Sequence, residues 1–206
     1  MHADALTYAG SKLVPALAKF NDFYLVGGTA LALQIGHRLS IDFDLFTSQL
    51  LNSQLLTQVK RVVAPRSVLV TYRTAEQLNL IVDDVKVTFF QYPYPTIDLF
   101  VPYKGLNLVS VHEIAAMKAF AIGKRLAYKD YIDWYFLLHD KFVTLPVVIA
   151  LAKKKFGGDF NDRLFLGQLI SLEDVPTQPV TFLRQPIERT EIEQFLEYEV
   201  SKFQLL

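Results

Sequence analysis

The sequence contains no cysteine. This absence excludes disulfide bridges, thiolate nucleophiles and cysteine-ligated zinc or iron–sulfur centres, and it agrees with a reducing compartment. The chain also has no excess of either charge, because its 21 Lys and Arg residues are balanced by 21 Asp and Glu residues. A contact with nucleic acid would therefore need a local basic patch, since the net charge attracts no polyanion.

Long apolar runs are missing as well. No window approaches the ~20 uninterrupted apolar residues that a membrane span requires, and residues 1–20 lack the basic and then apolar segments of a secretory signal. We therefore expect a cytoplasmic protein that does not contact a membrane. Hydrophobic residues make up 51% of the 206-residue chain, with 16 Phe and 10 Tyr, which is enough for a sizeable core in one domain or one domain with an extension.

Hydrophobic periodicity predicts an α/β (α+β) fold with a mixed sheet in the N-terminal half, followed by a helical C-terminal half. Residues 1–105 are expected to form the α/β core and residues 106–206 a helical region packed on it, with 92–107 as a linking stretch. The predicted strands cover residues 23–26, 40–46, 67–73, 78–82 and 85–91. The predicted helices cover residues 4–19, 29–35, 51–63, 110–123, 128–139, 145–156 and 187–203.

An acidic pair stands in the second predicted strand. At a period of two, Ser40, Asp42 and Asp44 share one strand face, while Ile41 and its alternate neighbours share the other. Two carboxylates on one face repel each other unless a cation lies between them, and oxygen ligands suit Mg²⁺ or Mn²⁺. The alternative is an ordinary solvated strand face or edge, on which charges oppose aggregation.

Gly27 and Gly28 lie between the first predicted strand and the helix that follows it. Free backbone N–H groups and the helix dipole favour a phosphate at such a place, and Thr29 adds a hydroxyl. A glycine pair alone is also compatible with a tight turn. The order of glycine pair, short helix and Asp-x-Asp strand is more specific, because it brings a polyphosphate cradle next to a metal site, as metal-assisted nucleotidyl transfer requires.

The run GGTALALQIGHRLSIDFDLF, residues 27–46, resembles motif I of the AbiEii/AbiGii nucleotidyltransferase toxins, within the polymerase-β-like superfamily. The resemblance implies a nucleotidyltransferase fold and a role for each matching residue. Gly27, Gly28 and Thr29 would hold the triphosphate, and Asp42 and Asp44 would bind the metal. Arg38 and Ser40 stand where the motif has its Arg and its Ser or Thr, and would also contact phosphate.

A second stretch, residues 117–125 and 129–133, resembles a later helical motif of the same family, which pairs a Lys with an Arg, here Lys118 and Arg125. Lys118 lies within an apolar helical stripe, where an ammonium group needs a partner. The partner is a phosphate in one interpretation. In the others Lys118 reaches the solvent or forms a salt bridge to Asp130. Asp130 is accordingly either a structural partner or a catalytic group.

The family pattern has one gap in this sequence. Polymerase-β-like enzymes generally carry a third carboxylate on a neighbouring strand, which here would be residues 85–90. Lys86 and Thr88 share the face on which that carboxylate should lie, and neither is acidic. Asp83 and Asp84 precede the strand. Asp130 could supply the base instead, or the site could bind nucleotide without transferring it.

Two further features have simpler interpretations. His37 follows the predicted helix 29–35, and a structural role is favoured for it. The run Lys153–Lys155 is interpreted as the solvated end of a helix, with contact to an RNA backbone as the alternative.

The resemblance implies an enzyme that moves a nucleoside monophosphate from a nucleoside triphosphate to an acceptor hydroxyl on tRNA or another macromolecule. It also implies the toxin of a toxin–antitoxin or abortive-infection system, whose partner is a cognate antitoxin protein or that antitoxin's DNA-binding partner. Three rivals remain. They are a degenerate nucleotide-binding module, a small-molecule transferase of the kind that modifies antibiotics, and a purely structural partner protein.

Overall fold

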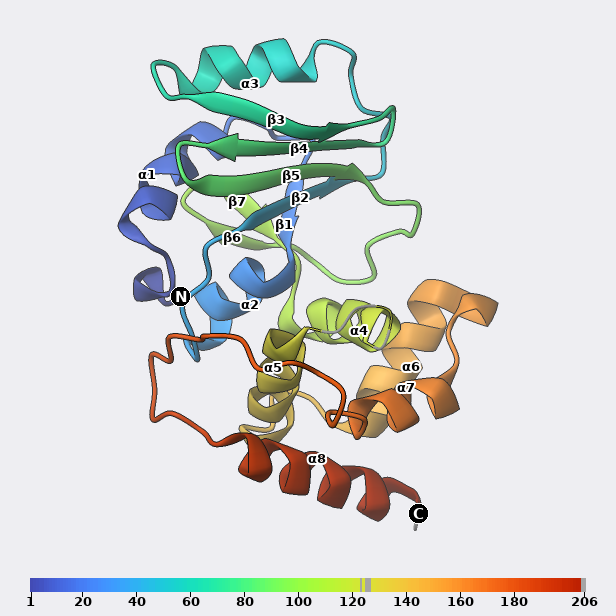
Figure 1. Cartoon of the computed structure of the whole chain (residues 1–206). Helices are drawn as coiled ribbons and strands as arrows, with labels where there is room; N and C mark the ends of the chain where they lie inside the picture. The colour runs from blue at the N-terminus through green and yellow to red at the C-terminus, as the bar shows by residue number, and fades with distance from the viewer. Residues whose placement is uncertain (123, 125–126, 205–206) are drawn as a thin grey trace. The chain divides into compact units, whose positions relative to one another are not determined.

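The computed structural model describes residues 1–122, 124 and 127–204. Gly123, the expected end of one helix, and Arg125 of the helical motif lie outside the described residues. The chain forms two compact units. The first contains Met1–Pro95 and Leu99–Ser110, and the second contains Thr96–Asp98 and Val111–Leu206 (Figure 1).

The first unit is built on a mixed sheet of seven strands in the order β3-β4-β5-β2-β1-β7-β6. The pairs β2–β5 and β1–β7 are parallel, and the other neighbours are antiparallel. This architecture confirms the predicted fold class. The strands are β1 (Tyr24–Val26), β2 (Phe43–Thr47), β3 (Val68–Arg73), β4 (Gln77–Val82), β5 (Val85–Gln91), β6 (Val101–Tyr103) and β7 (Leu106–Leu108).

The sheet has two different faces over β2, β4 and β5, where buried and partly exposed residues alternate. We call the buried side the closed face. It carries Phe43, Leu45, Leu78, Leu80, Val82, Val85, Val87 and Phe89. We call the other side the open face. On these strands it carries Asp44, Phe46, Gln77, Asn79, Ile81, Lys86, Thr88 and Phe90. This alternation is the period-two pattern expected when one face of a sheet is packed and the other is polar.

The helices of the first unit are η1 (Ala3–Ala5), α1 (Tyr8–Leu17), α2 (Gly27–Ile35) and α3 (Leu55–Val63). Helix α1 begins later than predicted because Thr7 caps it by accepting a hydrogen bond from the Gly10 backbone N–H. Gly10 itself faces the Phe43 ring, so α1 lies against the closed face. Helix α2 ends at Gly36, whose φ of +63° is the left-handed conformation expected of a C-terminal glycine.

Two strand predictions require correction. The second strand begins at Phe43 and not at Ser40, because Ser40 forms a bridge to Leu6 and its N–H donates to the Ala5 carbonyl oxygen. The expected linking stretch 92–107 contains β6 and most of β7, which extend the sheet beyond β1. Both errors concern partners that are distant in the sequence, which a local hydrophobic pattern cannot reveal.

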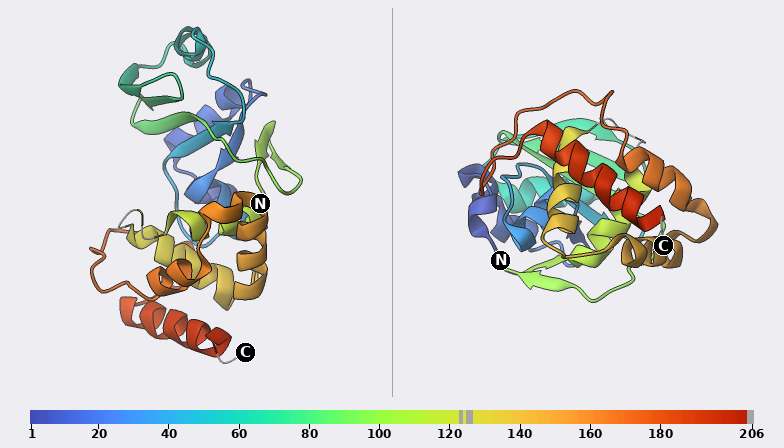
Figure 2. Two further views of the ribbon diagram at one scale, coloured as in Figure 1. Left: turned by 90° about the vertical axis from the view of Figure 1, so that its right-hand side faces the viewer. Right: turned by 90° about the horizontal axis from the view of Figure 1, so that it is seen from below.

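The second unit is helical. Its helices are α4 (Val111–Ala121), α5 (Tyr128–His139), α6 (Leu145–Phe156), η2 (Gly157–Asp159), α7 (Asp162–Leu169) and α8 (Arg189–Gln204). Helix α7 was not predicted, although Asn161 caps its N-terminus by accepting from the Leu164 N–H. Helix α8 packs against α5 and α6 (Figure 2). Among the described residues, no helix is both long and apolar enough to cross a membrane.

A buried ion pair organises this unit. The Lys155 ammonium donates to Oε1 of Glu113 at 2.7 Å, and the backbone N–H groups of Ile97 and Asp98 donate to Oε2 of the same carboxylate at 3.1 and 3.3 Å. This pairing joins residues 96–98 to the helices of the second unit. The interpretation of Lys153–Lys155 as a solvated helix end therefore holds for the exposed Lys153 and Lys154 and is wrong for Lys155, which is only 4% exposed.

Candidate nucleotidyltransferase site

The candidate site begins at Gly27, the first residue of α2, directly after β1. Its φ of +71° lies in the left-handed region, which glycine adopts with little penalty. A Cβ atom placed on Gly27 would lie 2.8 Å from Oδ2 of Asp44. Glycine is therefore required here by the backbone conformation and also by the close approach of a carboxylate from β2.

Gly28 makes room for the Arg38 guanidinium group in the same way. A Cβ atom placed on it would lie 2.6 Å from Nη2 of Arg38 and 3.6 Å from Oγ of Ser40. Arg38 is only 3% exposed, and its Nη1 also donates to the Leu39 carbonyl oxygen at 3.2 Å. The guanidinium group and the positive end of the α2 dipole thus lie at one corner, which favours an anion.

Thr29 ties α2 to the loop that leads into β2. Its hydroxyl donates to the Asp42 carbonyl oxygen and shares a hydrogen bond with the Ser40 hydroxyl at 2.8 Å. Thr29 is 2% exposed and Ser40 is 8% exposed. These hydroxyls therefore fix the geometry between the glycine pair and the acidic pair. Their direct contact with phosphate stays a prediction.

The two acidic residues do not share one strand. Asp44 lies on the open face of β2, whereas Asp42 belongs to the preceding loop and is half-exposed. The expected strand face of Ser40, Asp42 and Asp44 is therefore wrong, and Ile41 is 46% exposed instead of facing the core. The loop still holds both carboxyl-bearing residues close to α2, because Thr29 bonds the Asp42 backbone and Gly27 adjoins Asp44.

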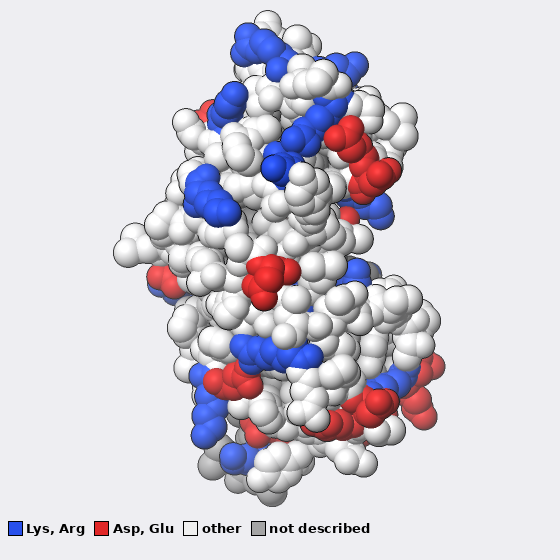
Figure 3. All heavy atoms as spheres, turned by 90° about the vertical axis from the view of Figure 1, so that its left-hand side faces the viewer, with Lys and Arg blue, Asp and Glu red and all other residues white. Residues whose placement is uncertain are grey.

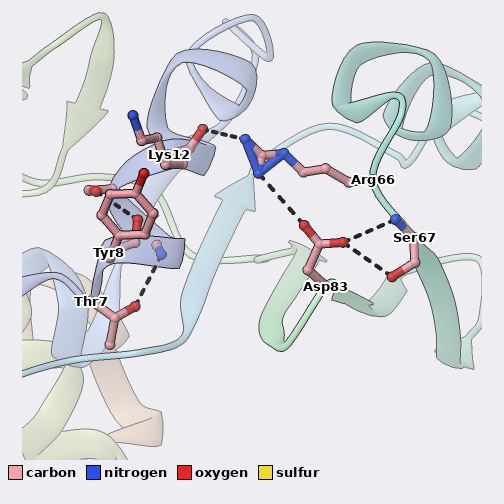
Figure 4. A network of polar contacts seen from close by, with 8 residues as sticks. Thr7, Tyr8, Lys12, Arg66, Ser67 and Asp83 are labelled. Atoms are coloured by element: carbon pink, nitrogen blue, oxygen red, sulfur yellow. Dashed lines mark hydrogen bonds and ion pairs between the residues drawn. The ribbon is translucent and has the colours of Figure 1, made fainter.

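The register confirms the missing third carboxylate. Asp44 is paired with Thr88 of the parallel strand β5, and Lys86 precedes Thr88 on the same face. Asp83 does not compensate, because its Oδ1 accepts from the Ser67 N–H and lies 3.2 Å from the Ser67 hydroxyl (Figure 4). Its Oδ2 lies 3.8 Å from Nη1 of Arg66. Asp83 therefore stabilises the turn between β4 and β5.

The second unit contains the other predicted residues. Nζ of Lys118 on α4 lies 2.7 Å from Oδ1 of Asp130 and 2.6 Å from Oδ2 of Asp133, both on α5. All three are buried. Burial by itself would lower the pKa of Lys118, but the Asp130 and Asp133 carboxylates more than offset this and raise the pKa above its usual value. The salt bridge considered for Lys118 is thus present and involves one more carboxylate. A phosphate contact by Lys118 and a catalytic role for Asp130 stay predictions.

Some contributors to the site give no local signal in the sequence. The His2 ring packs on Gly36, since a Cβ atom there would lie 2.3 Å from His2 Nδ1. The His2 N–H donates to the Leu33 carbonyl oxygen at 2.7 Å. Together with the Leu6–Ser40 bridge, these contacts hold the N-terminal residues against the loop that carries Arg38 and Ser40. The pairing of two segments more than thirty residues apart could be found only in three dimensions.

Comparison with known proteins identifies the family of this chain. The family described as "Nucleotidyl transferase AbiEii toxin, Type IV TA system" matches residues 13–201. The uncharacterized protein aq_aa25 of Aquifex aeolicus (strain VF5) is 32% identical over 195 residues, which cover 92% of each protein. The crystal structure of a "putative nucleotidyltransferase from H. pylori" superposes with a TM-score of 0.55 at 17% identity, covering 94% of this chain and 92% of that one. JHP933 from Helicobacter pylori gives a TM-score of 0.49 at 16% identity, with the same coverage of each chain. With the family match extending over both units, and with a nucleotidyltransferase fold around the glycine and aspartate pairs, this chain belongs to the AbiEii nucleotidyltransferase toxin family.

Proposed function

We propose that this protein transfers a nucleoside monophosphate from a nucleoside triphosphate to a hydroxyl group of tRNA or a similar RNA acceptor. The observation that carries the proposal is the corner at the start of α2. There Gly27 adjoins the Asp44 carboxylate, and Gly28 adjoins the buried Arg38 guanidinium. One edge suits a cation and the other suits a polyphosphate, as nucleotidyl transfer needs.

Mg²⁺ or Mn²⁺ fits the acidic edge. The chain offers oxygen ligands from Asp42 and Asp44, and Mg²⁺ is commonly held by one or two carboxylates plus substrate phosphates and water. No group of three or more His, Asp or Glu side chains suited to a metal occurs in the described part of the chain, so phosphate oxygens would complete the coordination. When bound, the ion would neutralise charge that develops on the phosphate oxygens.

The remaining groups would position the nucleotide. Backbone N–H groups in the first turn of α2 have no partner within the helix, so they can donate to phosphate oxygens, and Arg38 adds positive charge. The acceptor oxygen would form a bond to the α-phosphorus as the bond to the bridging oxygen breaks. Pyrophosphate would leave, and the hydroxyl proton would pass to solvent, because Thr88 offers no carboxylate beside Asp44.

A local basic patch supports a nucleic-acid acceptor. Lys12 of α1, together with Lys60 and Arg61 of α3, is exposed, and neither helix contains an acidic residue. Arg66 adjoins them, because its Nη2 donates to the Lys12 carbonyl oxygen at 3.0 Å. Figure 3 shows Lys and Arg side chains gathered on this side of the first unit. Such a patch attracts phosphates even though the whole chain has no net charge.

The family supports a wider biological role. We propose that the protein is the toxin of a type IV toxin–antitoxin system that acts in abortive infection, within the cytoplasm, and that a cognate antitoxin or that antitoxin's DNA-binding partner opposes it. Lys118 and Asp130 remain proposed catalytic residues through the family resemblance. In the structure the salt bridge between these two residues connects α4 to α5.

Label transfer provides the test of activity. Each labelled nucleoside triphosphate is incubated with Mg²⁺, total tRNA and the wild-type protein, Asp42→Ala or Asp44→Ala. Both substitutions should lower transfer at least a hundredfold, because they remove charge stabilisation that is commonly worth about 10²–10³ in rate. Asp22→Ala, an exposed aspartate in the loop before β1, is the matched control and should transfer normally.

A nucleotide sensor without transferase activity is the second candidate, and the Thr88 partner of Asp44 motivates it. It predicts that the wild-type protein binds a triphosphate in equilibrium dialysis but labels no acceptor, whichever nucleotide is used. Transfer by the wild type that survives both Asp42→Ala and Asp44→Ala would contradict the proposed site.

A further inference from the structure

The open face continues outward from the candidate site in two rows of cross-strand neighbours. One row runs from Asp44 through Thr88 and Asn79 to Tyr72, so it crosses β2, β5, β4 and β3. The parallel row beside it contains Phe46, Phe90 and Gln77. Residues that pair directly across strands lie on the same face of a sheet. The Asp44 carboxylate and the Tyr72 ring therefore belong to one surface.

A β-bulge places Tyr72 on this surface. Val70 pairs with Leu80 of the closed face, and simple alternation would put Tyr72 on that side too. One extra residue, Thr71, enters between the two pairs, so Tyr72 pairs with Asn79 of the open face instead. The Thr71 hydroxyl fixes the bulge by donating to the Asn79 carbonyl oxygen at 3.2 Å. Bulges often re-aim a side chain in this manner next to functional sites.

Aromatic rings lie together in the second row. The Phe46 ring centroid is 5.2 Å from that of Phe90 and 5.0 Å from that of Tyr92. Tyr92 in turn lies 5.4 Å from Tyr94. Phe46 follows Asp44 by two residues on the same strand, so this aromatic cluster begins next to the candidate site.

The composition of the open face suits an anionic polymer that carries aromatic rings. Strands β3, β4 and β5 contain no acidic residue, and Lys86 of β5 adds a positive charge to the open face. The amide side chains of Gln77 and Asn79 lie between the aromatic positions and are hydrogen-bonded to each other at 2.9 Å. Tyr72 is 50% exposed and Leu69, on the same face, is 61% exposed. A small cationic acceptor would need several acids here, and Asp44 of β2 is the one acid on the open face of β2, β3, β4 and β5.

We propose that the open face, from Asp44 to Tyr72, binds an unpaired segment of the RNA acceptor. The inference rests on the proposed function and names the surface that presents the acceptor to the Asp44 edge. Unpaired bases stack on aromatic rings and bond to amide groups through their edges, whereas paired bases cannot do so. Lys86 is placed to meet a phosphate of the same segment.

Binding of a fluorescent ten-nucleotide single-stranded RNA, followed by anisotropy, tests this surface. The full-length Asp42→Ala/Asp44→Ala protein is used, so that no transfer occurs during the measurement. Tyr72→Ala should weaken binding by about 5- to 100-fold, as loss of one stacking ring does, and Tyr72→Phe should bind almost as the parent does. Phe90→Leu should also weaken it. A double-stranded RNA of equal length should respond little to either substitution.

Tyr198→Ala is the matched control. Tyr198 is 60% exposed on the glutamate-rich helix α8 of the second unit, so its removal should leave binding of the single strand unchanged. Because Tyr72 is half-exposed, Tyr72→Ala should melt at nearly the parent temperature, which separates binding from folding. A change in molecular mass on light scattering for Tyr72→Ala, with RNA binding intact, would show that a protein covers this face.

The inference is overturned if single-stranded RNA does not bind, if Tyr72→Ala binds as the parent does, or if Tyr198→Ala loses as much affinity. The binding measurement itself needs no transferase activity, so this inference and the proposed function can fail separately. Transfer that is normal in Tyr72→Ala, at every acceptor concentration, would remove this inference and leave the proposed function standing. If RNA binding depends on Tyr72 but the wild-type protein never transfers a nucleotide, the proposed function fails and the RNA-binding surface remains.

Discussion

Gly27→Ala tests how closely Asp44 approaches the start of α2. A non-glycine residue at a φ of +71° costs about 1–2 kcal/mol. The new methyl group would also lie 2.8 Å from Oδ2 of Asp44, so the carboxylate must move away. Overpacking of this kind costs about 1–3 kcal/mol. We therefore expect Gly27→Ala to lower the free energy of unfolding by about 2–5 kcal/mol, the sum of both costs.

Equilibrium urea unfolding of a double-mutant cycle separates the two costs. In an Asp44→Ala background the collision is gone, so Gly27→Ala should cost only the backbone part of about 1–2 kcal/mol. If Gly27→Ala costs the same with and without the Asp44 carboxylate, the close approach and the site geometry built on it are wrong.

The remaining predictions concern the buried polar contacts. Lys118→Met should lower the free energy of unfolding by about 3–5 kcal/mol, because it removes an ammonium group that lies within 2.7 Å of the buried Asp130 and Asp133 carboxylates. Lys154→Met, at an exposed position, should cost little. Since the pKa of Lys118 is raised, its contribution is complete below pH ~10.4 and is lost only as the pH rises through the higher folded-state pKa. The difference between wild type and Lys118→Met should thus stay constant from pH ~7 to ~9, and a decline within that window would contradict the ion-pair account. Thr29→Val should cost about 1–3 kcal/mol in urea unfolding, because the buried Ser40 hydroxyl and the part-buried Asp42 carbonyl oxygen lose their donor, whereas Thr29→Ser should restore most of it.

Local patterns located most elements and the glycine–aspartate motif. The periods of two and 3.6 gave β4, β5, α5 and α6 to within a residue or so. For β4, β5 and α6 they did so because one face of each element is buried and the other is not, so apolar residues recur with the period of the element. Helix α5 is buried over almost its whole length. The same reasoning extended β2 too far toward Ser40 and missed β6, β7 and α7, whose packing partners come from elsewhere in the chain.

The sequence by itself determined the family, the glycine pair that opens α2, the acidic pair that follows it, and the threonine in place of a third acid. Each of these can be recognised from the types of residues that stand close together in the sequence. The tertiary structure alone decided which groups adjoin one another. It placed Asp44 against Gly27 and Arg38 against Gly28, enclosed Lys118 between two carboxylates, and turned Tyr72 onto the open face. The physical reason is that these contacts depend on strand register, a bulge and burial, which arise only when distant segments pack together.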